Sequence, residues 1–163
     1  MKTVFTTFLF MSLLIFTGCG GGGDSEADKS SKDKSTSQAE NGLTEFEMEH
    51  GIGPITEVVE LGELNREMAE EGKEIFRAKC SACHKPTERY IGPAPEGVLD
   101  RRSPAYVMNM IMNPDEMTKK HPEAKKLMQE YMSPMPFQNV SEEQARAIVE
   151  YFRTIEAEVE TEE

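Results

Sequence analysis

Apolar residues recur at helical spacing in four segments of the chain. In residues 64–79, and in a last segment that opens at Ser141, they fall at every third or fourth position, as one face of an amphipathic helix requires. Two shorter helices are predicted between them, one over 103–112 and one over about 122–131. No segment of useful length alternates apolar and polar residues as a half-buried strand does. The pattern therefore predicts an all-α fold of about four short helices.

The residues at the predicted helix ends support these boundaries. Ser103 and Pro104 are a favoured cap and first-turn pair, and Asn113-Pro114 ends the same helix. Ser141-Glu142-Glu143-Gln144 has the pattern of a capping box. Gly72 lies inside the first predicted helix, where a glycine costs about 1 kcal/mol relative to alanine. This glycine therefore needs a packing reason.

The first 18 residues read as an export signal. The apolar run from Val4 to Phe16 is shorter than the roughly 20 residues that a membrane-spanning helix needs. Phe16-Thr17-Gly18-Cys19 resembles the lipobox of bacterial lipoproteins, in which the cysteine is lipidated and becomes the new N-terminus. The alternative is an ordinary secretory signal followed by a chance cysteine. We expect a protein anchored by lipid to a bacterial membrane and facing the periplasm.

The rest of the chain divides into a tether, an extension and a domain. Residues 19–42 are rich in Gly, Ser, Lys, Asp and Glu and contain no aromatic residue, so they are predicted to be a disordered tether. Residues 43–66 are too apolar for a linker and are predicted to be an extension that packs on the domain. Residues 67–163 are the predicted domain.

Composition excludes some functions. The 163 residues carry 18 Lys and Arg against 30 Asp and Glu, a formal net charge of −12. A nucleic-acid-binding protein would need a basic face, so this class is excluded. Three cysteines are too few for a scaffold stapled by disulfides, and each cysteine therefore requires its own explanation.

Cys80-Ser81-Ala82-Cys83-His84 is the motif with the clearest chemistry. Residues three apart share a helix face, so both thiols can bond to one haem while the next residue offers an imidazole to the iron. The motif has three alternative interpretations. A zinc site would require a second cluster of ligands, and a thioredoxin-like pair would require a βαβ setting. The third is a structural disulfide between Cys80 and Cys83.

Residues 69–157 resemble the class I mono-haem cytochromes c. The resemblance rests on Gly72-Lys73-Glu74-Ile75-Phe76 before Cys80, Ile91-Gly92-Pro93 after His84, Met135-Pro136, and a closing helix with Tyr151-Phe152. It implies a small cytochrome c fold around one covalent haem c. In that family the glycine at position 72 lets the last helix cross closely, and the proline loop supplies a backbone carbonyl to the proximal histidine, here Pro93 to His84.

The resemblance also implies the metal ligands. The proximal ligand would be His84, and the distal ligand would be a methionine followed by proline ahead of the last helix, here Met135. Met132 is the alternative. A ligand from His50 or His121 would instead give a bis-histidine iron, but His121, which precedes Pro122 among lysines, is expected to be a solvated surface residue.

Arg101 and Arg102 are candidates to pair with the haem propionates. The other methionines considered as distal ligand are expected to fill gaps in the core: Met108, Met110, Met112, Met117 and Met128.

An iron with two protein ligands has no open position for a substrate, so the predicted function is electron transfer in a respiratory chain and not catalysis. The expected partners of this monomer are a donor complex and a terminal oxidase or reductase, such as a haem–copper oxidase or nitrous-oxide reductase. Residues 85–126 carry eight Lys and Arg against six Asp and Glu, which favours an acidic partner. Two alternatives stay open: a sensor or enzyme with a labile distal methionine, and a non-haem lipoprotein with a Cys80–Cys83 disulfide.

Overall fold

The structure, a computed structural model, describes residues 42–162. The predicted signal peptide, Cys19 and all but the last residue of the predicted tether lie outside these residues. No strand occurs between residues 42 and 162, and the predicted all-α class is confirmed. Within the same residues, no helix is both long and apolar enough to cross a membrane. The helices are α1 (Glu45–His50), α2 (Arg66–Lys79), α3 (Val98–Arg101), α4 (Pro104–Met112), α5 (Pro114–Lys120), α6 (Pro122–Tyr131) and α7 (Glu142–Glu162).

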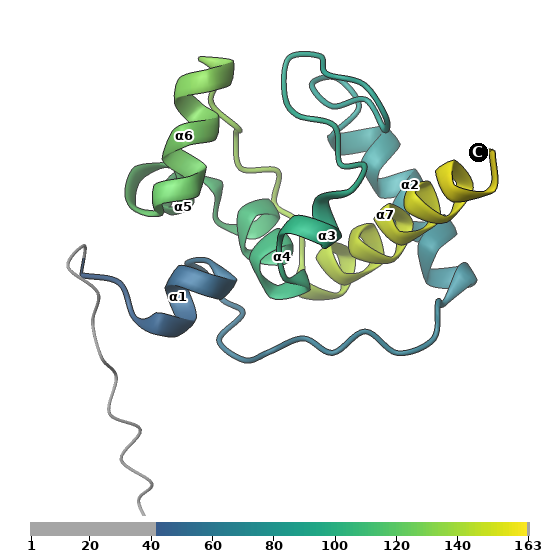
Figure 1. Cartoon of the computed structure of the whole chain (residues 1–163), viewed down its shortest axis with the longest axis horizontal. Coiled ribbons are helices and arrows are strands. Elements are labelled where there is room, and N and C mark those ends of the chain that lie inside the picture. Colours follow the sequence, from purple (N-terminus) through teal and green to yellow (C-terminus); the bar gives the residue numbers. More distant parts are fainter. Residues whose placement is uncertain (1–41, 163) are drawn as a thin grey trace, which may run out of the picture. The chain divides into compact units, whose positions relative to one another are not determined.

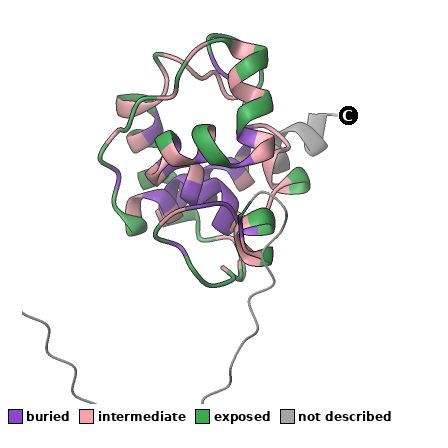
Figure 2. Ribbon diagram, turned by 90° about the vertical axis from the view of Figure 1, so that its left-hand side faces the viewer, coloured by how far each residue is buried: buried purple, intermediate pink, exposed green. Residues whose placement is uncertain are grey.

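The core forms where α2 crosses α7 (Figure 1). Gly72 lies at the crossing, and a Cβ atom added to it would lie 2.0 Å from the backbone oxygen of Ala147. The close approach lets Phe76 pack against Tyr151 and Phe152, with ring centroids 5.5 and 5.8 Å apart. Figure 2 shows buried residues gathered in the middle of the domain, with exposed residues on the outward faces of the helices.

Side-chain caps set the beginnings of the longer helices. The Asn65 side chain accepts a hydrogen bond from the amide of Met68, so α2 begins at Arg66, two residues later than predicted. The Ser103 hydroxyl accepts from the amide of Tyr106, as the pattern at the start of α4 predicted. The Ser141 hydroxyl accepts from the amide of Gln144, and the Gln144 side chain accepts from the amide of Ser141. The predicted capping box is therefore confirmed.

Three short helices were not predicted: α1, α3 and α5. The omission of α5 has a clear physical reason, because Asn113-Pro114 does end α4 while Pro114 also opens the next helix. Proline fits the first turn of a helix, where its missing amide hydrogen leaves nothing unpaired. Helix α5 has only seven residues, and Met117 is its main buried apolar side chain, so its sequence shows no clear helical period of apolar residues.

The segment before α2 packs against α4. The Asn109 side chain donates to the carbonyls of His50 and Ile55, each at 3.0 Å, and its oxygen accepts from the amide of Ile55 at 3.0 Å. Gly53 lies directly against it, since a Cβ there would come within 2.4 Å of the Asn109 Oδ1. From there residues 56–65 run past α4 to the start of α2 (Figure 1). One buried amide thus fixes a segment more than fifty residues away in sequence.

The expectation of a solvated His121 is wrong. This residue is 1 % exposed, and its ring lies edge-on to Tyr106 at 5.1 Å between centroids. Its Nε2 donates to the carbonyl of Met48 at 3.1 Å, while its Nδ1 accepts from the amide of Glu123 at 3.2 Å. The neighbouring lysines are indeed exposed, but α1, more than seventy residues earlier, covers the imidazole.

We predict that Gly72→Ala destabilises the protein by about 2 kcal/mol, because overpacking at a crossing with no room outweighs the gain in helix propensity. The measurement is urea unfolding of the protein. Gly62→Ala is the control, since a Cβ at residue 62 meets nothing within 4 Å and should change the free energy of unfolding by less than about 0.5 kcal/mol. Equal effects of the two substitutions would contradict the role of the crossing.

Stability should also fall in mild acid because of His121. Burial lowers the pKa of His121 below its ordinary value, and both ring nitrogens are hydrogen-bonded as a neutral imidazole needs. The unfolded chain therefore binds a proton more readily, and the stabilisation is complete above about pH 6.5 and is lost as the pH falls below it.

The measurement is the free energy of unfolding at pH 7.5 and pH 5.5 for the wild type and for His121→Gln. The wild type should lose more stability between these two conditions than the variant, which is less stable at both. A drop of the same size in both proteins would show that His121 does not contribute.

Candidate functional site

One cavity of about 430 Å³ brings together residues from the motif and from the loop before α7. Cys80, Cys83, His84 and Met135 all line it, although Met135 lies about fifty residues after the motif. The wall between them is apolar and includes Phe76, Ile148 and Phe152 at the α2–α7 crossing and Leu127 and Met128 on α6. This volume lies within the range of sites for small molecules and cofactors.

The end of α2 positions the two cysteines. The amide of Cys80 still bonds to the carbonyl of Phe76 at 2.8 Å, and the amides of Cys83 and His84 both bond to the carbonyl of Cys80. The chain therefore continues from the helix into a tight turn that presents residues 80–84 to the cavity. No disulfide joins the two cysteines, and both are half-buried.

The imidazole of His84 is fixed on its far side. Its Nδ1 lies 2.8 Å from the carbonyl oxygen of Pro93, which can only accept, so Nδ1 carries the hydrogen and Nε2 keeps its lone pair. Gly92 packs against the ring, and a Cβ there would lie 2.5 Å from His84 Cε1. The amide of Gly92 bonds in turn to the carbonyl of Cys83 at 2.8 Å. A histidine in this state is a good metal ligand.

The structure separates the two candidate distal methionines. Met135 is half-buried and lines the cavity, whereas Met132 is 84 % exposed and does not. Met108 and Met117 are buried in the core, as expected from the sequence. Met110 is only half-buried, and it lines the cavity together with Met128. The cavity is therefore lined by three thioethers, two of which the sequence reasoning had assigned to the core.

Neither of the other histidines reaches the cavity. The Nδ1 of His50 lies 2.8 Å from the hydroxyl of Ser103, and the Nε2 of His121 bonds to the backbone of α1. Among residues 42–155, whose side chains the structure describes, no three side chains of His, Cys, Asp or Glu gather closely enough to hold a metal ion. The described part of the chain thus offers no zinc-type ligand cluster.

Polar groups gather at another part of the cavity wall. Arg101 and Arg102 both line it; Arg101 donates to the carbonyl of Glu96, and Arg102 forms an ion pair of 2.7 Å with Glu123. Tyr106 also lines the cavity, and its buried hydroxyl has no hydrogen-bond partner among the described residues. The sequence reasoning missed Tyr106, which fits the apolar pattern of α4. Two guanidinium groups and an unpaired hydroxyl suit a bound group that carries carboxylates.

The thiol chemistry argues against a redox-active cysteine pair. Burial is the main cause that raises the pKa of Cys80 to about 11, and the nearby Lys79 only partly offsets it. Thiol–disulfide exchange needs a thiolate, and the known exchange motifs achieve it by lowering the pKa. Cys80 therefore lacks the lowered pKa that such exchange motifs use.

These observations together fit a covalently attached haem. Two thiols, an oriented imidazole and a thioether line the same apolar cavity, and two arginine side chains line it as well. The fit depends on Gly92, whose missing side chain leaves space for the ring of His84.

Comparisons with known proteins agree with this site. The family model for cytochrome c matches residues 69–156. A solved cytochrome c from Rhodothermus marinus is 43 % identical with a TM-score of 0.65, covering 69 % of this chain and 97 % of that one. A solved cytochrome c domain from Pseudomonas putida is 29 % identical with a TM-score of 0.51, and the match covers 55 % of this chain and 92 % of that one. A curated cytochrome c-553-like protein from Synechocystis is 37 % identical over 46 residues, which span 28 % of this chain and 44 % of that protein. The match thus spans less than half of that curated relative.

We predict that Gly92→Ala disturbs the proximal histidine, because the new methyl group overlaps the imidazole that the carbonyl of Pro93 orients. The haem-loaded variant should lose about 2 kcal/mol of stability and show an altered electron paramagnetic resonance spectrum of the ferric iron. Gly62→Ala again serves as the control. An unchanged spectrum and stability would mean that the ring has room to move.

Proposed function

This chain belongs to the cytochrome c family, and we propose that it is a lipid-anchored electron carrier whose haem iron is ligated by His84 and Met135. The family carries haem c bound covalently through two cysteines, here Cys80 and Cys83. When bound, the haem supplies a reversible one-electron couple. The chain's own residues determine the ligands, the polarity around the iron and the access of partners.

The observation that carries the proposal is the shared cavity of His84 and Met135. The two side chains come from opposite ends of the domain sequence and line the same space as the two thiols. The hydrogen bond from His84 Nδ1 to Pro93 leaves Nε2 available as a ligand. If His84 and Met135 both hold the iron, no position would remain for a substrate, which favours electron transfer over catalysis.

The ligand set and its surroundings would tune the reduction potential. A methionine in place of a second histidine raises the potential. The apolar wall excludes water, and we propose that Arg101, Arg102 and Tyr106 bind the propionates at the polar part of the cavity. These features support a carrier of moderately high potential that acts late in a respiratory chain.

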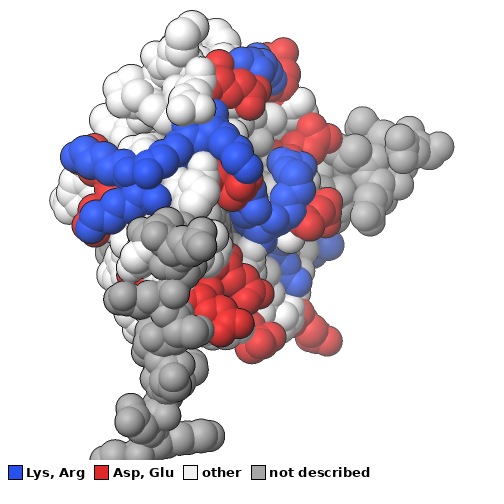
Figure 3. Space-filling model, turned by 60° about the vertical axis from the view of Figure 1, so that its left-hand side comes forward, with Lys and Arg blue, Asp and Glu red and all other residues white. Residues whose placement is uncertain are grey.

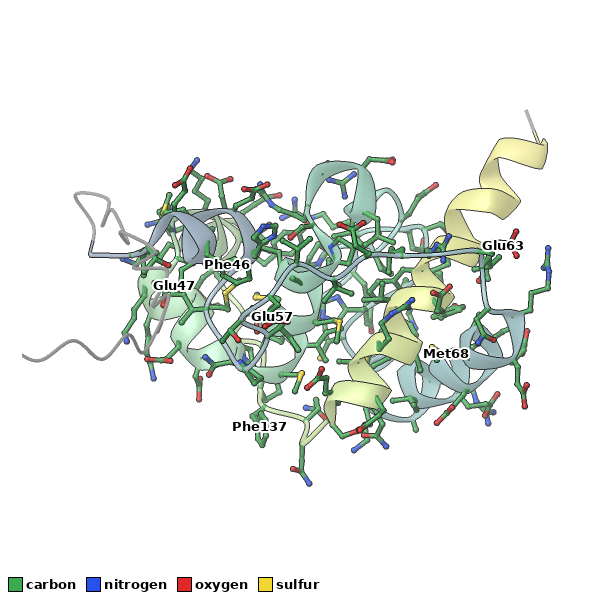
Figure 4. All side chains as sticks on the ribbon, turned by 90° about the horizontal axis from the view of Figure 1, so that it is seen from below. Phe46, Glu47, Glu57, Glu63, Met68 and Phe137 are labelled. Carbon is green, nitrogen blue, oxygen red and sulfur yellow. The ribbon has the colours of Figure 1, made fainter. Side chains whose placement is uncertain are left out.

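Exposed apolar side chains near the cavity suit docking of a redox partner. Tyr90, Ile91 and Phe137 are 54 %, 43 % and 57 % exposed, and Ile91 also lines the cavity. Figure 4 shows Phe137 projecting outward from the loop that carries Met135. Such a patch would meet the partner where electrons enter and leave.

Charge supports the kind of partner. Lys85 and Arg89 both precede Tyr90 in the loop after His84, and the Lys85 ammonium lies 5.0 Å from the Tyr90 ring centroid. Figure 3 shows further Lys and Arg in groups bordered by Asp and Glu on the side where α1, α5 and α6 lie. We propose acidic partners for this monomer: a donor complex and a terminal oxidase or reductase, for which a haem–copper oxidase and nitrous-oxide reductase are candidates.

Anchoring is proposed from the sequence of the N-terminal residues. Phe16-Thr17-Gly18-Cys19 supports lipidation of Cys19, and the residues that follow would reach about 25–30 Å as a flexible coil. The domain would then stay at the periplasmic face of a bacterial membrane. This distance is enough to meet more than one partner in the same membrane.

The test of the proposed ligation compares Met135→Leu with Met132→Leu. The oxidised wild type should show the charge-transfer band between methionine sulfur and iron. Met132→Leu should keep the band, since Met132 is 84 % exposed and outside the cavity. Met135→Leu should lose it and show a lower reduction potential.

The two variants exchange the same atoms, so they control for each other. A band that survives Met135→Leu would mean that another side chain ligates the iron, with Met110 and Met128 the next candidates in the cavity. A colourless protein would remove the haem assignment itself.

A further inference from the structure

The segment that carries Met135 is bounded by two strained residues. Residues 132–139, which we call the distal segment, contain no regular secondary structure. Its first and last residues, Met132 and Asn139, are the two non-glycine residues with positive φ between residues 42 and 162, at 49° and 50°. Pro134 and Pro136 stiffen the part between them. The segment therefore resembles a rigid piece that ends at two bends, and its conformation needs support from outside.

Lys79 supplies one outside contact. Its Nζ donates to the carbonyl oxygen of Gln138 at 3.0 Å, across 59 positions of sequence. Gln138 directly precedes the bend at Asn139, and Lys79 directly precedes Cys80. The residue beside the first haem-binding cysteine thus holds the far end of the distal segment.

Arg89 supplies a second outside contact at the other end. Its Nη1 lies 2.5 Å from Glu130 Oε1, its Nη2 donates to the Glu130 carbonyl at 3.4 Å, and its guanidinium lies 4.2 Å from the Tyr131 ring centroid. Glu130 and Tyr131 end α6 immediately before the bend at Met132. Arg89 belongs to the loop that follows His84 and is therefore far from Met135 in sequence.

We infer that Lys79 and Arg89 are positioning residues that together hold the distal segment closed, so that Met135 stays on the iron. Both come from the part of the chain that carries the haem-attachment motif. Lys79 contacts Gln138, which precedes the bend at Asn139, and Arg89 contacts Glu130, which precedes the bend at Met132. Losing either contact favours a conformation in which the segment swings away and the sixth position of the iron becomes accessible. The inference rests on the proposed ligation by Met135.

These contacts are weak enough to allow an equilibrium between a closed and an open conformation of the distal segment. The side chains of Arg89 and Glu130 are 57 % and 52 % exposed, and Lys79 is half-buried, so water competes for all three. An exposed ion pair contributes little by charge alone, but the stacking of a guanidinium on an aromatic ring adds a contact that water does not replace. Arg89 thus acts through its planar shape as well as its charge.

The experiment measures imidazole binding to the ferric, haem-loaded domain by stopped flow. At high imidazole concentration the observed rate reaches a limit, which is the rate at which Met135 leaves the iron. This limit should rise about fivefold in Lys79→Met and in Arg89→Met, the factor expected for the loss of one typical hydrogen bond in a partly exposed position. The double variant should show about the product of the two, since the contacts lie at opposite ends of the segment.

Two further variants separate the role from charge and from general destabilisation. Arg89→Lys keeps the charge but loses the planar stack, and its limiting rate should also rise. Lys73→Met removes a charge from the exposed face of α2, where Lys73 has one weak contact of 3.9 Å with Glu70, and it should leave the limit unchanged. An increase in Lys73→Met equal to that in Lys79→Met would overturn the inference.

Met135→Leu distinguishes a failure of the inference from a failure of the proposed function. It should bind imidazole with no limiting step, because no methionine has to leave. If its rate still reaches the wild-type limit, the ligation by Met135 is wrong and the inference falls with it. If it behaves as expected while both basic variants stay within twofold of the wild type, the inference alone is wrong.

Discussion

Helices α2 and α7 can touch backbone to backbone because residue 72 has no side chain. Through this contact Phe76 packs between Tyr151 and Phe152, and the two helices form the apolar wall of the cavity. The crossing also fixes the direction in which α2 ends, and therefore where Cys80 and Cys83 lie. The rest of the site is arranged around this wall: the loop with Pro93 orients His84, and the loop before α7 brings Met135 to the same space. A covalent cofactor needs such a fixed wall, because its attachment points cannot adjust independently.

Local signals in the sequence were enough for the longer helices and for the motif. Ser103, Pro104 and the capping box at Ser141 define helix starts by contacts within a few residues, which is why these predictions are confirmed. The spacing of Cys80, Cys83 and His84 identifies haem attachment because the chemistry itself depends on neighbouring residues. Short helices such as α5 could not be predicted in this way, because its two buried residues, Pro114 and Met117, are too few to show a helical period.

Features that depend on distant parts of the chain could not be predicted in the same way. His121 is buried by α1, and nothing near it in sequence indicates that cover. Tyr106 occupies an apolar position of α4, so its unpaired hydroxyl at the cavity becomes visible only in three dimensions. The contacts of Lys79 and Arg89 join segments 59 and 41 positions apart. The resemblance gave the ligand candidates and the contact between His84 and Pro93, but nothing in the sequence indicated the contacts of Lys79 and Arg89.

The attachment of the N-terminal segment to α4 has a mechanical consequence. A pull on the chain at residue 42 would first load Leu43, which packs in the cluster formed with Met117 and Ala124, and then the bonds that Asn109 makes to residues 50–55. These contacts lie on α4, α5 and α6, whereas the cysteines lie at the end of α2, beyond a further stretch of extended chain. Force applied at residue 42 is therefore carried into the body of the domain before it reaches Cys80 and Cys83. The N-terminal segment therefore transmits a pull first to α4, α5 and α6 and not directly to the end of α2.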